Sequence, residues 1–328
     1  MNEKKINPDR AIKVGAKKIH DNRKFMYDEV EKTHQKYLDK NGFYKLNLLE
    51  KRVKCPLCSS IKIFHIFNKR GGKYSICKNC DLVFLNPVFK NKELIKYYKN
   101  LHDAQSKVTL KEKKFYSKIY LSGIQIVNQY IKKKNFAFDI GCSNGLFLDL
   151  LKKNGWQNTH GQELNIKEAA IAKKNHKIFT AEINNIDQKS AYNLVTLWDV
   201  IEHIKNGKSF LGVVNRLLKK KGYLFIQTPN AQSLAAKIMH EKCNVFDGLA
   251  HVNLYDFKNL DLLCKQSGFK KIYSRTILSE IPIINNFLNF QNPYFGNVAG
   301  KTILNFLNEE DIHKNYLGYK TQALYQKI

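Results

Sequence analysis

Two cysteine pairs have the residue types and the spacing of a metal site. Each pair forms a C-x-x-C turn, Cys55 with Cys58 and Cys77 with Cys80, and 18 residues lie between the two turns. This spacing is typical of zinc sites in which four thiolates complete a closed tetrahedral shell and leave no open position for a substrate. The pattern therefore predicts a structural zinc ion in a small zinc ribbon over residues 51–90.

A glycine-rich turn is the second candidate site. Asp139, Gly141 and Gly145 follow an apolar run in the pattern D-x-G-x-x-x-G. Gly141 permits a tight turn, Gly145 lets the next helix pack closely, and the exposed amides at a helix start favour polar ligand groups. Glu163, which is expected at the end of the next strand, can accept hydrogen bonds from ribose hydroxyls. These residues indicate a nucleoside-bearing cofactor, although the spacing differs from the G-x-G-x-x-G turn of dinucleotide sites.

His203 is a candidate general base. It follows an expected strand on the edge of the sheet where open α/β folds bind ligands. Histidine titrates near neutral pH, so it can take a proton from a hydroxyl acceptor. Asp199 and Glu202 lie close by in the sequence and could orient a histidine or cap the next helix. A purely structural, hydrogen-bonded histidine is the alternative.

The elements that would position these residues alternate between strand and helix. We expect strands at 136–140, 159–163, 177–181, 194–198, 223–228, 269–274 and 319–325, and helices near 146–153, 166–174, 208–218 and 256–266. This alternation predicts an α/β fold with a Rossmann-like, doubly wound parallel sheet.

The remaining segments divide the chain further. Residues 1–50 form a polar extension with a helical pattern around 25–37, and 91–134 form a helical bridge with helices near 91–101 and 109–132. The cofactor domain is expected over 135–328. Within it, 280–312 breaks the alternation and is interpreted as a lid or substrate-binding appendage, whose aromatic residues could cover an acceptor or pack on the sheet: Phe287, Phe290, Tyr294 and Phe295.

The sequence over about 135–275 resembles the class I S-adenosylmethionine-dependent methyltransferases, in particular the group with ubiquinone-biosynthesis O-methyltransferases and sugar methyltransferases. The resemblance rests on F-A-F-D-I-G-C-S-N-G at 136–145, G-Q-E-L-N at 161–165, Y-N-L-V-T-L-W-D-V-I-E-H-I at 192–204 and K-G-Y-L-F-I-Q-T-P-N at 221–230. The resemblance implies S-adenosylmethionine as the cofactor and a methyltransferase sheet preceded by a zinc ribbon.

The same resemblance implies a role for each matching residue. Asp139, Gly141, Cys142 and Gly145 would line the methionine and ribose end, Glu163 would bind the ribose diol, Glu182 would lie near the adenine, and Trp198 and Asp199 would lie beside the methyl group. The family often has Asp where this chain has Glu182. His251, in H-V-N-L-Y-D, resembles the family's histidine that faces the acceptor, so it is the second candidate base.

Composition narrows the class of partner. Lys and Arg outnumber Asp and Glu by 56 to 28, which gives a net charge of +28. This charge would suit phosphate-rich partners. It is also expected of a Lys-rich composition, because the Lys residues are spread over the whole chain. Nucleic acid is therefore a partner that we do not favour. No signal peptide or membrane-spanning run is visible, so we expect a cytoplasmic protein. The sequence gives no indication of oligomeric state.

The expected activity is methyl transfer to a hydroxyl of a small-molecule acceptor, a sugar or nucleotide-linked sugar in surface-polysaccharide or secondary metabolism. An RNA methyltransferase that uses the basic surface and the zinc ribbon is one alternative. A catalytically silent cofactor-binding module is the other. The Asn/Asp-Pro-Pro-aromatic motif associated with exocyclic-amine methylation is missing from the sequence, which disfavours methylation of adenine nitrogen in DNA or RNA.

Overall fold

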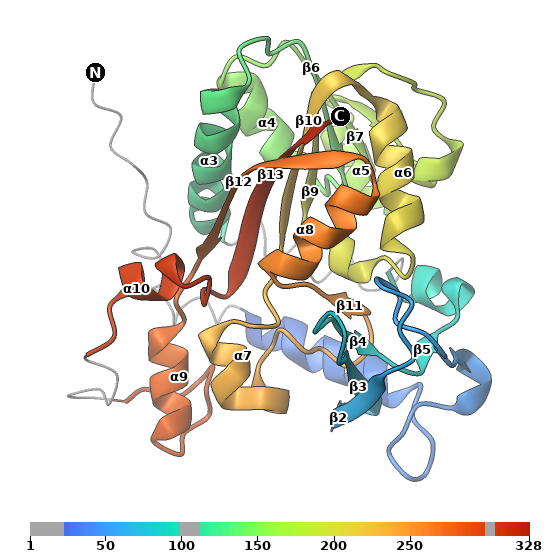
Figure 1. Ribbon diagram of the computed structural model, residues 1–328, viewed down its shortest axis with the longest axis vertical. Coiled ribbons are helices and arrows are strands. Elements are labelled where there is room, and N and C mark those ends of the chain that lie inside the picture. Colours follow the sequence, from blue (N-terminus) through green and yellow to red (C-terminus); the bar gives the residue numbers. More distant parts are fainter. Residues whose placement is uncertain (1–22, 99–111, 299–305) are drawn as a thin grey trace.

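A seven-stranded sheet forms the centre of the molecule (Figure 1). The computed structural model describes residues 23–98, 112–298 and 306–328. The strands, in spatial order, are β12 (Phe269–Ile277), β13 (Lys320–Lys327), β10 (Leu218–Pro229), β9 (Tyr192–Trp198), β6 (Phe136–Ile140), β7 (Asn158–Gln162) and β8 (Lys177–Phe179). β13 runs antiparallel to β10 and β12, and the other neighbours are parallel. The predicted α/β sheet is therefore confirmed.

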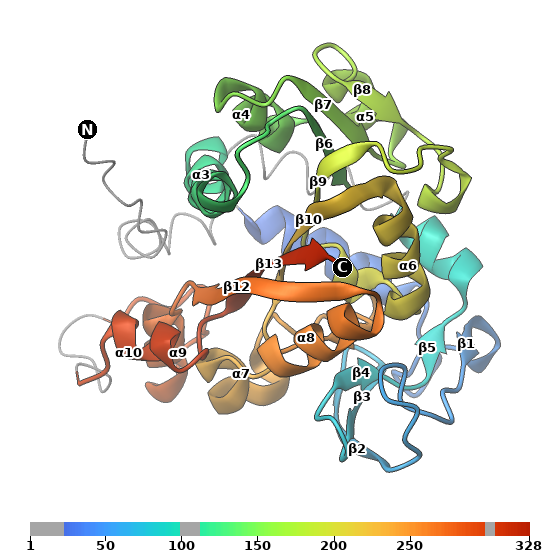
Figure 2. The same cartoon turned by 45° about the horizontal axis from the view of Figure 1, so that its top comes forward.

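Helices cover both faces of this sheet, as Figure 2 shows. α3 (Lys113–Tyr130) and α4 (Leu146–Lys153) pack on one face, and α6 (Gly207–Leu217) and α8 (Phe257–Gln266) pack on the other. The central strands are apolar and almost fully buried, as expected for parallel strands covered on both sides. Two separate apolar cores result, and the one beneath α6 and α8 continues into the cysteine-bearing segment through Leu57, Leu82 and Phe84.

Polar side chains fix where several helices begin. Asn165 accepts hydrogen bonds from the first backbone amides of α5 (Ile166–Ala172), and Asn206 does the same for α6. Asp256 and Asn259 form a capping box at the start of α8. Such caps satisfy amides that have no partner within the helix, so they set the helix start within one residue.

The cysteine-bearing segment forms a second, four-stranded sheet. Its order is β11 (Asn253–Leu254), β4 (Val83–Leu85), β3 (Gly72–Cys77) and β2 (Ile63–Lys69). Three strands come from the expected ribbon, but the fourth comes from the cofactor domain some 170 residues later in the chain. A further short pair, β1 (Leu49–Glu50) with β5 (Val88–Phe89), flanks it. The ribbon is thus joined to the cofactor domain by backbone hydrogen bonds.

The 280–312 segment contains α9 (Ile281–Leu288) and the start of α10 (Glu309–Lys314). α9 packs on α7 (Leu234–Met239) in a third apolar cluster, which also includes Phe287. Phe290 is fully exposed, so it does not pack on the sheet.

The N-terminal extension and the bridge at 91–134 both contain helices where the structure describes them. Residues 23–35 and 91–98 are helical, and the helix expected at 109–132 is found as α3. The described residues do not include positions 109–111 of that expected helix. They also do not include the first 22 residues of the expected extension. Among the described residues, none of the helices combines the length and the apolar character needed to cross a bilayer.

Candidate functional site

The glycine loop between β6 and α4 is tightly packed. Gly141 and Gly145 have φ angles of +73° and +86°, which side-chain-bearing residues rarely adopt. A Cβ on Gly141 would lie 3.0 Å from Val200 Cγ2, and a Cβ on Gly145 would lie 3.1 Å from Ala172 Cβ. Both glycines are therefore required by the close approach of neighbouring segments, as the sequence predicted.

Glu163 holds this loop in place. Its carboxylate is buried and accepts hydrogen bonds from the backbone amides of Ser143, at 2.9 Å, and Asn165, at 2.8 Å. It therefore ties the loop to the start of α5. A carboxylate can accept about four hydrogen bonds, so this structural role is compatible with contact to a ligand hydroxyl.

Asp139 and Cys142 lie beneath the loop. The carboxyl of Asp139 accepts a 2.6 Å hydrogen bond from Thr196 on the adjacent strand, and burial raises the pKa of this carboxyl to about 8. Burial also raises the pKa of the Cys142 thiol, whose sulfur packs against Gly161. Both side chains shape the floor of the loop from inside the protein.

Asp199 ends β9 in a strained conformation. Its φ of +55° is unusual for a residue with a side chain, and such strain is often found at functional sites. One carboxylate oxygen accepts hydrogen bonds from Gln227, at 3.1 Å, and Lys320. The other, Oδ1, is buried without a hydrogen-bond partner among the described residues. It is an acceptor that a ligand donor would satisfy.

Trp198 and Glu182 differ in their surroundings. Trp198 is buried, and its ring packs 4.8 Å from that of Tyr120 and 4.9 Å from that of Phe225. Glu182 follows β8 and is exposed. Trp198 is the last residue of β9, so both residues stand at or just after the carboxyl end of a parallel strand, where ligands bind in open α/β sheets.

The two candidate histidines lie side by side. Their ring centroids are 5.1 Å apart, although 48 positions separate His203, in the short helix η3 (Ile201–His203), from His251. His203 Nδ1 donates to the carbonyl oxygen of Ala250 at 3.0 Å, and His251 Nδ1 donates to that of Val245 at 2.6 Å. Because a carbonyl can only accept, Nδ1 carries the proton in both rings, and Nε2 holds the lone pair of each neutral imidazole.

Glu202 completes this histidine cluster. It is fully buried, and one carboxylate oxygen accepts a 3.0 Å hydrogen bond from Thr228. The other, Oε1, lies 4.0 Å from His203 Nε2 and has no hydrogen-bond partner within the described part of the chain. Burial and the nearby Asp199 raise the pKa of this carboxyl to about 7.

The histidine cluster has two chemical uses. One ligand atom from each of Glu202, His203 and His251 lies within 4.8 Å of the others. A neutral imidazole beside a carboxylate can accept a proton from a hydroxyl. The same donors suit a divalent cation, because metal-binding histidines commonly donate their other nitrogen to a backbone carbonyl. The sequence pointed to both histidines, but the carbonyls that orient them were visible only in the structure.

The four cysteines form a cluster whose shape matches the predicted zinc site. Their sulfurs lie within 4.8 Å of one another, with Cys55 to Cys80 at 3.6 Å and Cys58 to Cys77 at 3.5 Å. A tetrahedral zinc ion with Zn–S bonds of about 2.3 Å would space its sulfurs by roughly 3.8 Å. The donor set and its geometry therefore fit a structural zinc ion.

Comparisons with known proteins found similarity to methyltransferases. Residues 116–274 match a family model described as a methyltransferase domain. An uncharacterized protein of Methanocaldococcus jannaschii is 27% identical over 220 residues, covering 57% of this chain and 85% of that protein. The ubiquinone biosynthesis O-methyltransferase of Cronobacter sakazakii is 25% identical over 103 residues, which is 29% of this chain and 42% of the enzyme. The chain thus spans less than half the length of that enzyme.

Solved structures are similar too. A S-adenosylmethionine-dependent methyltransferase from Archaeoglobus fulgidus has 18% sequence identity and a TM-score of 0.46, covering 66% of this chain and 98% of that one. The domain match, the strand order and the glycine loop lead to one conclusion. Residues 116–274 of this chain are similar to methyltransferase domains, and the strand order and the glycine loop agree with the expected cofactor, S-adenosylmethionine.

Proposed function

We propose that this chain transfers the methyl group of S-adenosylmethionine to a hydroxyl of a small-molecule acceptor. The acceptor class is a sugar or nucleotide-linked sugar of surface-polysaccharide or secondary metabolism. The pairing of His203 with His251 beside the buried Glu202 carries this proposal, because it puts proton-accepting groups at the carboxyl edge of the cofactor sheet. The similar Cronobacter enzyme is an O-methyltransferase, which supports transfer to oxygen.

Residues around the glycine loop would hold the cofactor. The tight turn at Gly141 and Gly145 would let the cofactor approach the backbone closely, and Glu163 would accept from the ribose hydroxyls. The orphaned Oδ1 of Asp199 would accept from the cofactor's ammonium group. Asp139, Cys142, Trp198 and Glu182 would complete the surroundings, as the family resemblance implies. When bound, the cofactor supplies an electrophilic methyl group on a positively charged sulfur.

The histidine cluster would remove the acceptor's proton. The carbonyls of Ala250 and Val245 hold both rings through Nδ1, so Nε2 is the nitrogen that would accept the proton. The carboxylate of Glu202 would stabilise the imidazolium that forms. A divalent cation bound by the same three residues would lower the pKa of the hydroxyl instead, and this is the second candidate for the deprotonation step.

The cysteine cluster would have a structural role. We propose that it binds one zinc ion, because four thiolates at these distances leave no open coordination position. This ion would hold the ribbon and, through β11, the segment that bears His251.

A labelled-methyl assay with nucleotide sugars, polysaccharide precursors, phenolic metabolites and total RNA tests the acceptor. We expect transfer to the sugar pool. His203→Ala and His251→Ala should each lower kcat by about 100-fold or more, because a general base acts in the transition state. Affinity for S-adenosylhomocysteine should remain unchanged. His240→Asn is the control, since His240 is an exposed histidine with a positive φ that Asn tolerates.

Two results would overturn this account. Wild-type activity in both histidine variants would eliminate histidine base catalysis and cation binding together. Transfer to RNA alone would favour the alternative substrate class. A chelator distinguishes the two deprotonation routes: activity that persists in EDTA supports the free base, whereas loss that Mg²⁺ reverses supports the cation.

A further inference from the structure

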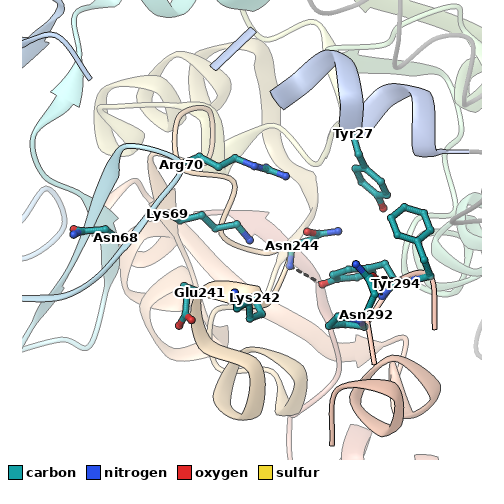
Figure 3. A pocket seen from close by; sticks show the side chains of 11 residues that line it. Tyr27, Asn68, Lys69, Arg70, Glu241, Lys242, Asn244, Asn292 and Tyr294 are labelled. Atoms are coloured by element: carbon teal, nitrogen blue, oxygen red, sulfur yellow. Dashed lines mark hydrogen bonds between the residues drawn. The ribbon is translucent and has the colours of Figure 1, made fainter. Parts of the chain in front are cut away.

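A cavity of about 400 Å³ lies where four distant segments meet, and none of its lining residues belongs to the glycine loop. Figure 3 shows Lys69 and Arg70 extending from the β2–β3 hairpin toward Tyr27 and Tyr294 on the other side. The helix at 23–35, the hairpin, the 241–244 segment and the loop after α9 supply its walls. Its volume is in the range of small-molecule sites.

Basic side chains outnumber acidic ones in the lining of the cavity. Lys69, Arg70 and Lys242 line it together with one carboxylate, Glu241, while Glu31 lies outside the lining and pairs with Arg70. Lys69 Nζ donates to the carbonyl oxygen of Cys243 at 2.8 Å and not to a carboxylate. Burial and the neighbouring Arg70 lower the pKa of Lys69 to about 8. An anion bound here would offset the cost of burying this ammonium group.

Arg70 is held rigidly at the hairpin turn. Its φ is +48°, Nε donates to Glu31 at 2.8 Å, and Nη1 donates to the carbonyl oxygen of Asp247 at 3.5 Å. A guanidinium has five N–H donors in a planar fork. The two contacts to Glu31 and Asp247 therefore leave donors that match the oxygens of a phosphate group.

Aromatic rings form the opposite wall. The ring centroid of Tyr27 lies 6.4 Å from that of Tyr294 and 6.0 Å from that of Phe295. Tyr294 is buried, and its hydroxyl accepts a 2.6 Å hydrogen bond from the backbone amide of Asn244. The ring of Tyr294 is thus fixed in place, and aromatic rings of this kind are surfaces on which nucleobases stack.

A short segment connects the cavity with the histidine cluster. Asn244 lines the cavity, and the next residue, Val245, provides the carbonyl that orients His251. Asp247 Oδ1 accepts the backbone amides of Leu249, Ala250 and His251, at 2.8 to 3.0 Å. One rigid turn therefore contributes both to the cavity wall and to the proposed base.

We propose that this cavity binds the nucleoside diphosphate end of a nucleotide-linked acceptor. The diphosphate would bind Lys69, Arg70 and Lys242, and the base would stack on the wall formed by Tyr27 and Phe295. This assignment rests on the proposed function and narrows its acceptor class from sugars in general to nucleotide-linked sugars.

Calorimetric titration of the full chain with UDP, dTDP, GDP, ADP and inorganic pyrophosphate tests the cavity without requiring turnover. We expect at least one nucleoside diphosphate to bind more tightly than pyrophosphate. Lys69→Met and Arg70→Met should each weaken it by about tenfold or more. Lys62→Met, a change to an exposed lysine of the same ribbon that does not line the cavity, should leave its affinity unchanged.

S-adenosylhomocysteine is titrated into every variant as a folding control. Its unchanged affinity, together with weakened nucleoside diphosphate binding only in the Lys69 and Arg70 variants, supports the cavity. Three results overturn it: no binding by any nucleoside diphosphate, equal binding of pyrophosphate, or displacement by an RNA oligonucleotide of higher affinity. If a nucleoside diphosphate binds here but no nucleotide-linked sugar is methylated, the cavity stands and the proposed acceptor fails.

Discussion

At the residue scale, the side chain of Glu163 has more than one structural role. Its carboxylate orders the glycine loop through Ser143 and the start of α5 through Asn165. A residue that stabilises a loop and also contacts the ligand has two effects when it is replaced. The measured loss of affinity for the ligand then has two parts: the lost contact with the ligand, and the free energy needed to order the glycine loop when the ligand binds.

We therefore expect Glu163→Ala to lose most of the rise in Tm that S-adenosylhomocysteine gives the wild type. At a ligand concentration about 100 times Kd, that stabilisation is about 2.7 kcal/mol. Gly141→Arg should lose it as well, because a side chain at a φ of +73° meets Val200. Thermal unfolding with and without ligand measures the difference, and Glu310→Gln is an exposed carboxylate control. Equal ligand-induced shifts in all four proteins would place the cofactor elsewhere.

The sequence predicted single residues well where the backbone itself sets the requirement. The tight turn at Gly141 and Gly145 follows from spacing alone, because only a few residue types tolerate such φ angles. The pairing of His203 with His251 could not be derived in this way. It depends on a turn that brings the carbonyls of Val245 and Ala250 to the two rings, and the sequence carries no local pattern for it.

At the scale of elements, the ribbon and the cofactor domain share a strand. β11 pairs with β4, so the four-stranded sheet requires both parts of the chain. Periodicity predicted the long strands because they are apolar over several residues, as in β9 and β10. A strand of two residues, Asn253–Leu254, is too short for any periodic pattern, and its partner is too distant in the sequence for a hairpin signal.

Removal of the metal should act on this shared sheet. The double variant Cys55→Ser with Cys58→Ser should lose the expected zinc content of about one ion per chain, measured by elemental analysis. Hydrogen exchange should then become faster in β2 to β4 and in β11, while the central sheet stays protected. Cys264→Ala, a change in α8 outside the cluster, is the control. A zinc-free wild type with a protected ribbon would contradict the metal assignment.

Charge is a property of the whole molecule. The net charge of +28 is spread along the chain, so general attraction to polyanions is expected without a specific site. We expect only weak binding to RNA, with a logarithmic affinity that falls steeply with logarithmic salt as counterions are released. Fluorescence anisotropy over a salt series measures this slope, with heparin as the competitor. Submicromolar affinity for one defined RNA at physiological salt would reverse our preference for a small acceptor.

The strand β11, which the cofactor domain contributes to the ribbon's sheet, has a thermodynamic consequence. Val252, directly after His251, accepts a backbone hydrogen bond from Leu85 of β4 and donates one to the carbonyl of Glu202. Two binding equilibria that order the same backbone are linked, and the linkage is reciprocal. Zinc bound in the ribbon would therefore tighten acceptor binding by the same factor by which the acceptor would tighten zinc binding. Loss of the metal would therefore lower the affinity for the acceptor and leave the affinity for the cofactor largely unchanged. The supply of metal would then control the binding of one of the two substrates only.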